Sequence, residues 1–204
     1  MKRDAACRAT LTRLAGLHYG MQGLIANQLR RFALSRVGRD GWVQAVRATG
    51  GGLPEEVPAL GRTYPDEAIV AVVVAIAEAS GTGVTEILQD FGHFLAPSLL
   101  RVYEPLVKAQ WRTLDVIEHV ERQIHTVVRL RDPDAGPPEL KATRISDSSV
   151  EVEYTSGRRL CALAEGIVRG LGDHYGERLE IEQPECMHRG DARCLIRVDI
   201  APAA

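Results

Sequence analysis

Apolar residues recur every three or four positions along the first two thirds of the chain, a pattern typical of helices that bury one face. Gly38 is expected to end the first of these helices, and the glycine-rich run 50–54 predicts a loop. Gly92 is expected to break or bend a later helix. Helices are predicted over 22–37, 41–49, 66–80, 85–105 and from about 113 to a turn at 132–138.

The last third of the chain changes to short runs in which apolar and polar residues alternate. Asp147 and Ser148 predict a tight turn between two of these runs, and a helix is expected over 160–174. The predicted strands are 140–146, 149–156, 178–184 and 193–199. This order predicts an α+β fold, in which an N-terminal helical part packs on a C-terminal four-stranded antiparallel sheet with helices.

A histidine lies at the edge of the apolar stripe on the helix that follows Thr113. The stripe consists of Val116, Ile117, Val120, Ile124, Val127 and Val128. His125 lies on its shoulder, beside Val128 and Leu114, whereas His119 projects elsewhere. A histidine in such a place is either a hydrogen-bonded core residue or a metal ligand, and the stripe alone favours the core residue.

The strand predicted over 149–156 runs into three polar residues, Tyr154, Ser156 and Arg158. In an extended chain they share one face, because side chains alternate between the two faces of a strand. The forked donor of arginine and two hydroxyl groups suit a carboxylate. Taken alone, however, these residue types are more often the polar end of an ordinary strand.

The combination of His125, the pair Pro137-Pro138 and the run Y-x-S-x-R resembles the haem nitric oxide/oxygen-binding (H-NOX) family in order and spacing. The opening MQGLIANQLRRF, the run YPDE and the stretch DFGHF extend the resemblance from about 21 to 200. It implies one domain over 21–204, with a helical part at about 21–130, a sheet part at about 139–200 and haem b buried between them. Residues 1–20 are expected to be an N-terminal extension.

The resemblance also implies the roles of individual residues. His125 would be the proximal ligand of the iron, for which a neutral imidazole is suited. Pro138 would press on the porphyrin and distort it. Tyr154, Ser156 and Arg158 would hold the haem propionates.

The far side of the iron would be formed by apolar residues, namely Ile25, Leu95, Leu163 and Ile167. Members of the family that hold oxygen use a tyrosine hydroxyl at the place of Leu163, and leucine cannot donate a hydrogen bond. The resemblance therefore implies a five-coordinate ferrous haem that binds nitric oxide, with carbon monoxide as a laboratory ligand and a weak or absent oxygen complex. The alternative is that these four residues form a plain core.

A second candidate site comprises Cys161, Cys186, His188 and Cys194. Gly190-Asp191 can turn the chain so that two of the thiols face each other, and three thiolates with one imidazole would complete a tetrahedral zinc shell. The site resembles that of a cysteine-bearing subset of the H-NOX family and of vinyl-reductase-type domains. Gln183 occupies the position of that family's fourth ligand, so His188 would substitute for it. Buried free thiols are the alternative.

Composition narrows the class of protein. The chain has 204 residues, of which 45% are hydrophobic and 25% charged, as expected for one globular domain. A net charge of −2 and a pI near 6.3 provide no attraction to nucleic acid or to an anionic membrane. The longest apolar run, Ala68–Ala77, is too short to span a bilayer, and the N-terminus lacks the apolar core of a signal peptide, so a cytoplasmic location is expected.

The expected function is a haem-based gas sensor and not an enzyme, because neither a nucleophile with its base nor a phosphate-binding glycine loop is recognisable. No output domain follows in the sequence, so the signal is expected to pass in trans to a histidine kinase or a cyclic-di-nucleotide enzyme. A zinc–thiolate redox sensor on the same scaffold and a haem-free pocket for a small apolar ligand are alternatives. The vinyl-reductase likeness adds an enzyme that acts on tetrapyrroles or hydrocarbons.

Overall fold

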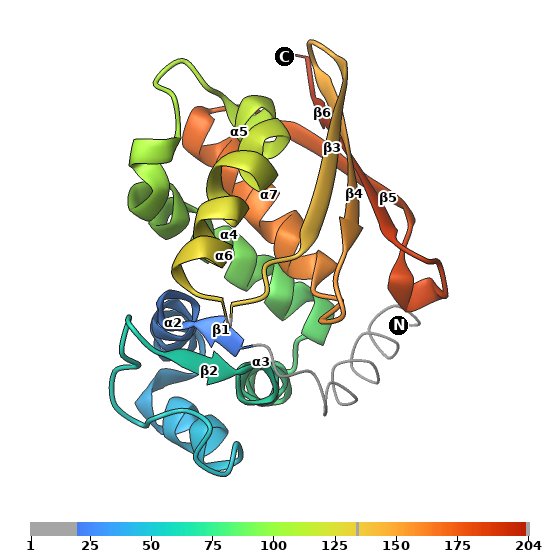
Figure 1. Cartoon of the computed structure of the whole chain (residues 1–204). Helices are drawn as coiled ribbons and strands as arrows, with labels where there is room; N and C mark the ends of the chain where they lie inside the picture. Colours follow the sequence, from blue (N-terminus) through green and yellow to red (C-terminus); the bar gives the residue numbers. More distant parts are fainter. Residues whose placement is uncertain (1–19, 134, 203–204) are drawn as a thin grey trace.

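The computed structural model describes residues 20–133 and 135–202, so the expected extension lies outside the described residues except for Gly20. The chain forms helices first and a sheet later (Figure 1). The first part contains β1 (Gly20–Gln22), α2 (Gly23–Arg47), β2 (Thr63–Pro65), α3 (Asp66–Ser80), α4 (Val84–Tyr103), η1 (Glu104–Leu106), α5 (Thr113–Val120), η2 (Glu121–His125) and α6 (Thr126–Arg131). The second part contains β3 (Glu139–Ser146), β4 (Ser149–Thr155), α7 (Cys161–Tyr175), β5 (Leu179–Glu185), η3 (Met187–Arg189) and β6 (Cys194–Ile200).

Two strands of three residues, β1 and β2, form an antiparallel ribbon that the apolar pattern did not predict. Such short strands hold too few residues to establish a period of two. Met21 pairs with Tyr64, and both side chains are buried. Because α2 and α3 follow directly after these strands, the ribbon holds the first turns of the two helices side by side.

Gly38 interrupts α2 as expected, since its φ of 72° lies in the left-handed region that favours glycine, and a second helical stretch continues to Arg47. Gly92 behaves differently from the prediction, because α4 continues through it. A Cβ atom added at Gly92 would lie 2.2 Å from the carbonyl oxygen of Leu163, and one added at Gly166 would lie 2.0 Å from that of Gln89. Gly92 is therefore a close-packing position where α4 crosses α7.

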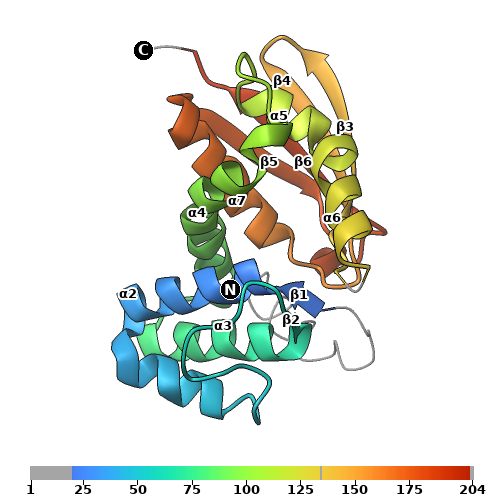
Figure 2. The ribbon, with the colours of Figure 1, turned by 60° about the vertical axis from the view of Figure 1, so that its left-hand side comes forward.

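The four-stranded sheet has the order β3-β4-β6-β5, with every neighbouring pair antiparallel. Val150, Val152 and Tyr154 on β4 are buried in a core shared with α5 and α7, while Glu151 and Glu153 alternate with them on the other face. Figures 1 and 2 show α5, α6 and α7 on one face of the sheet, with α2 and α3 in a separate layer beyond its end. The α+β fold with a four-stranded antiparallel sheet is thus confirmed.

The buried hydrophobic side chains form two separate cores. One joins α2, α3 and the first half of α4, and the other joins the sheet, α5 and α7. Ile167 on α7 packs against both of them. Figure 2 shows α4 running from the layer of α2 and α3 towards the sheet.

No single helix among the described residues is long and apolar enough to cross a membrane. Within residues 20–133 and 135–202, one pair of helices, Asp66–Ser80 and Val84–Leu106, meets the length and composition test jointly, and it is bent by 111°.

Candidate functional site

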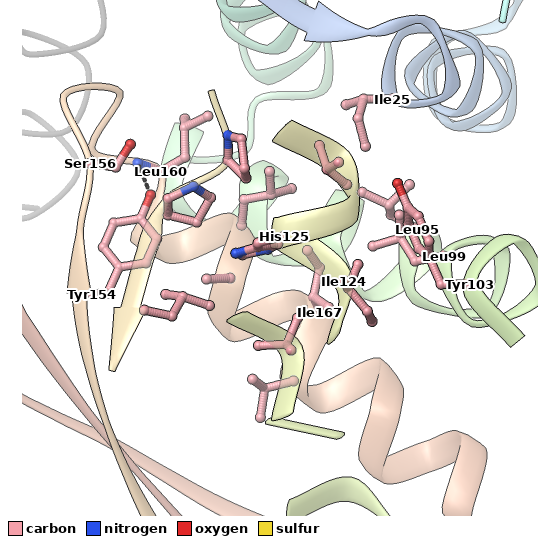
Figure 3. A pocket seen from close by; sticks show the side chains of 18 of the residues that line it. Ile25, Leu95, Leu99, Tyr103, Ile124, His125, Tyr154, Ser156, Leu160 and Ile167 are labelled. Atoms are coloured by element: carbon pink, nitrogen blue, oxygen red, sulfur yellow. Dashed lines mark hydrogen bonds between the residues drawn. The ribbon is translucent and has the colours of Figure 1, made fainter. Parts of the chain in front are cut away.

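A cavity of about 270 Å³ lies where the two cores meet, and most of the side chains that line it are apolar. Its wall includes the loop 135–138, the turn 156–160 and residues of β1, α2, α4, α5, η2, α6, β3, β4, α7 and β6. The structure brings to this one cavity every residue that the resemblance assigns to a haem, namely Ile25, Leu95, His125, Pro138, Tyr154, Ser156, Arg158, Leu163 and Ile167. Figure 3 shows Tyr154 and Ser156 on one side of His125 and Leu95 on the other.

His125 ends a single π-helical turn between α5 and α6, in which the Thr126 amide donates to the Glu121 carbonyl five residues earlier. Such turns are frequent at functional sites. The His125 side chain is 14% exposed, and its Nδ1 lies 2.9 Å from Oε2 of Glu121. Burial lowers the pKa of His125, although Glu121 opposes the change, so the ring is neutral at pH 7.

Glu121 is a residue of the site that the sequence reasoning missed, although its spacing of four from His125 on a helix was a usable signal. Its carboxylate also accepts from Arg129 at 2.7 Å and from the Leu140 amide at 3.2 Å. Burial alone would raise the pKa of Glu121, but the hydrogen bonds from Arg129 and His125 outweigh it and hold the pKa below its ordinary value. The ionised carboxylate offers only acceptors, so Nδ1 of His125 carries the proton and Nε2 has the lone pair.

The three donors of the run Y-x-S-x-R line the same cavity. Only Tyr154, however, lies on the strand whose alternation was expected to place all three on one face. β4 ends at Thr155, so Ser156 and Arg158 lie in the turn beyond the strand. The sequence pattern predicts a strand to 156, one residue beyond its end in the structure. The Tyr154 hydroxyl accepts from the Leu160 amide at 3.1 Å, and burial raises the pKa of Tyr154.

Arg158 links the sheet to the helical part. Its guanidinium donates to Oδ2 of Asp66 at 2.5 Å and to the carbonyls of Gly136 at 2.5 Å and Gly20 at 2.9 Å. Burial raises the pKa of Asp66 against the opposing effect of Arg158, and Oδ1 of Asp66 is buried with no partner among the described residues. These three bonds use three of the five N–H groups of a guanidinium, which leaves two for a ligand in the cavity.

The wall of the cavity that includes Ile25, Leu95, Leu163 and Ile167, here called the far wall, is less apolar than the sequence indicated. Tyr103 lies beside Leu95 and Leu99 in Figure 3, and its hydroxyl is 3.3 Å from Oε1 of Gln22. The sequence reasoning considered four apolar residues and missed this pair. The helical spacing of Leu95, Leu99 and Tyr103 on α4 would have identified the tyrosine.

The second candidate site is built from three buried thiols at the start of α7, after β5 and at the start of β6. The sulfur of Cys186 lies 3.9 Å from those of Cys161 and Cys194, and all three are within 4.8 Å of one another. Hydrogen bonds from Cys194, His188 and Gln183 lower the pKa of the Cys161 thiol. His188 does not belong to the mutually close set of sulfur atoms, and its Nε2 lies 2.7 Å from the Arg159 carbonyl oxygen.

Comparison with known proteins gives one family and one fold. Residues 22–183 match the model of the haem-NO-binding family. No curated protein sequence matches the chain. Among solved structures, an H-NOX protein from S. oneidensis in the Fe(II)NO state has a TM-score of 0.81 and 21% identity, over 89% of this chain and 100% of that one. A mutant of T. tengcongensis H-NOX has a TM-score of 0.76 and 18% identity, over 90% of this chain and 100% of that one. At these identities the structures establish the fold alone.

Proposed function

Because the chain belongs to the haem-NO-binding family, we propose that it is a haem-based gas sensor that binds nitric oxide at a five-coordinate ferrous haem. The observation that carries this proposal is the cavity where His125 meets Tyr154, Ser156 and Arg158. An apolar space with one imidazole in its wall and a group of donors suits haem b, which is a flat apolar macrocycle with two carboxylate tails. Because H-NOX domains are sensors, the function that we propose is sensing and not catalysis.

Each residue has a defined part in this proposal. His125 offers Nε2 to the iron, because Nδ1 is bound to Glu121. Arg158, Ser156 and Tyr154 line the cavity and would donate to the propionates, and Pro138 would lie against the macrocycle. When bound, the haem supplies an iron centre that takes up diatomic gases.

The selectivity for nitric oxide rests on the far wall. Ile25, Leu163 and Ile167 cannot donate a hydrogen bond, and the Tyr103 hydroxyl is already bound to Gln22. A bound dioxygen gains from a donor, whereas nitric oxide binds ferrous iron well without one. The S. oneidensis structures in the Fe(II)NO and Fe(II)CO states support nitric oxide and carbon monoxide as ligands of a protein with this fold.

The way in which gas binding would be signalled follows from the position of the cavity between the two hydrophobic cores. Gas binding that changes the bond at His125 would shift the helical part relative to the sheet part, since Arg158 ties the sheet to α3 and β1 across the cavity. The signal would pass in the cytoplasm to a separate protein such as a histidine kinase or a cyclic-di-nucleotide enzyme.

The absorption spectrum of the purified ferrous protein, before and after addition of nitric oxide, tests the proposal. We expect a haem spectrum that shifts with nitric oxide, and we expect His125→Gly to abolish the His-ligated spectrum unless imidazole is added. His119→Gly is the matched control, because His119 stacks on Trp111 at 4.5 Å and does not line the cavity. A preparation that stays colourless after haem is supplied would favour a pocket for another apolar ligand.

A second candidate function, a zinc–thiolate redox sensor, is favoured by the sulfur geometry. Bonds of about 2.3 Å in a tetrahedral zinc shell separate sulfur atoms by about 3.8 Å, close to the 3.9 Å measured here. His188 is the proposed fourth ligand, since its Nε2 faces the Arg159 carbonyl and its ring also interacts with Cys161. Oxidation of the thiolates would expel the metal.

Metal analysis of the purified protein tests this second function. We expect about one zinc per chain in the wild type and none in Cys186→Ser. Equal zinc in the two proteins would exclude the thiol site. His188→Ala should lower the zinc affinity without removing the thiols, and an unchanged affinity would exclude His188 as a ligand.

A further inference from the structure

We propose that Glu121 is a positioning residue that strengthens the bond between His125 and the iron, and so restrains the release of that histidine when nitric oxide binds. The inference rests on the proposed function, because it assigns His125 to the iron. It concerns a carboxylate that is not part of the cavity lining and that contacts His125 at Nδ1, the ring nitrogen not assigned to the iron.

The geometry of the contact supports this role. Oε2 of Glu121 lies 2.9 Å from Nδ1 of His125, which is the nitrogen turned away from any ligand held by Nε2. A carboxylate that accepts a hydrogen bond from Nδ1–H polarises that N–H bond and increases the electron density on Nε2. The consequence is a stronger iron–nitrogen bond and a ferric state that is more stable relative to the ferrous state.

Glu121 is held in place independently of any ligand. Arg129 binds Oε1 at 2.7 Å, and the Leu140 amide donates to Oε2 at 3.2 Å. Arg129 also donates to the Pro138 carbonyl at 3.2 Å, so the carboxylate, the histidine helix and the proline loop form one network. A side chain fixed from two elements loses little entropy when it orients the ring.

Arg129 opposes part of the effect of Glu121, because its positive charge draws electron density from the same carboxylate. The bond from Arg129 is to Oε1, while His125 uses Oε2, so the carboxylate serves both partners through different oxygens. Substitution of Glu121 and substitution of Arg129 should therefore change the iron–imidazole bond in opposite directions. Glu121→Gln should weaken the iron–imidazole bond, and Arg129→Gln should strengthen it.

The test uses the full chain loaded with haem. Resonance Raman spectroscopy of the ferrous protein measures the iron–imidazole stretching band, which should move to lower frequency in Glu121→Gln and to higher frequency in Arg129→Gln. The ferric/ferrous midpoint potential should rise in Glu121→Gln. Loss of the histidine after addition of nitric oxide, followed by stopped-flow absorbance, should become about tenfold faster or more.

Glu118→Gln is the matched control, because Glu118 is also a carboxylate near the end of α5 but binds Arg144 and not His125. It should leave the stretching band, the potential and the rate unchanged. ¹⁵N NMR of His125 in the haem-free chain provides a readout without iron: the wild type should show a protonated Nδ1, and Glu121→Gln should shift its resonance.

The outcomes separate the two proposals. A haem protein that loses its iron–imidazole band in His125→Gly, but whose band and midpoint potential are the same in Glu121→Gln as in the wild type, would overturn the role of Glu121 and leave the proposed function intact. A chain that takes up no haem would overturn both. Shifts of the band in opposite directions in the Glu121 and Arg129 variants, with none in Glu118→Gln, would establish the inference.

Discussion

The crossing of α4 and α7 at two glycines leads to a prediction about stability. In Gly92→Ala the new Cβ would lie 2.2 Å from the Leu163 carbonyl oxygen, more than 1 Å short of ordinary contact. The obstacle is backbone on a second helix and not a flexible side chain, so the helices themselves must move apart. Because Leu95 on α4 and Ile167 on α7 line the cavity, the displacement would reach the far wall.

The magnitude follows from two opposing effects. Overpacking against a rigid neighbour costs about 3 kcal/mol at the upper end of its range. Replacing glycine by alanine inside a helix contributes about 1 kcal/mol in the other direction. We therefore expect Gly92→Ala to lose about 2 kcal/mol of unfolding free energy, which corresponds to a fall in Tm of about 4–8 °C for a chain of this length.

Urea denaturation and thermal melts followed by circular dichroism measure this loss. Gly61→Ala is the control, because among the described residues no atom beyond Gly61 and its two chain neighbours lies within 4 Å of a Cβ built there. Gly166→Ala would meet the Gln89 carbonyl at the same crossing, and one separation of the helices relieves both contacts. The double variant should thus cost less than the sum of the two single variants. A Gly92→Ala protein as stable as the wild type would refute the reasoning.

Three further predictions concern the site. Asp66→Asn should destabilise the haem-free protein by about 3 kcal/mol in urea denaturation, since it leaves the Arg158 guanidinium buried without its carboxylate; it should destabilise the haem-loaded protein less, and equal losses would contradict the placing of a propionate at Arg158. Leu163→Tyr should give a ferrous protein with an oxygen complex visible by absorption, because it adds a second hydroxyl to the far wall, where that of Tyr103 is already bound to Gln22; an unchanged spectrum in air would count against the position of Leu163 beside the bound gas. The pKa of Glu121 is lower in the folded protein than its value near 4.5 in the unfolded chain. Its contribution to the unfolding free energy is therefore fully present above pH 4.5 and is lost as the pH falls through the folded pKa. The loss of unfolding free energy caused by Glu121→Gln should accordingly shrink between pH 6 and pH 3 in the haem-free protein. A loss independent of pH would exclude the Glu121–Arg129 ion pair as its cause.

Local pattern was sufficient for most of the secondary structure. The helical stripe that contains Val116 and Val128, and the alternation around Val150, depend on neighbours a few positions away, so their periods can be read from the chain itself. The order and spacing of His125, Pro138 and Tyr154 identified the family, which the comparison confirms over residues 22–183. These are properties of sequence separation, and folding does not alter them.

Only the tertiary structure decided which distant groups meet. Arg158 reaches Asp66, 92 positions earlier in the chain, and Cys161 approaches Cys186 from a different element. The hydrogen bond of Glu121 to His125 lies within helical reach, yet its support by the Leu140 amide depends on where β3 passes the helix. The sequence alone presents Gly92 as a helix breaker, whereas in the structure α7 occupies the space beside it. Local sequence determines a period and a spacing, whereas the packing of separate elements determines which donors, acceptors and thiols come within a few ångströms of each other.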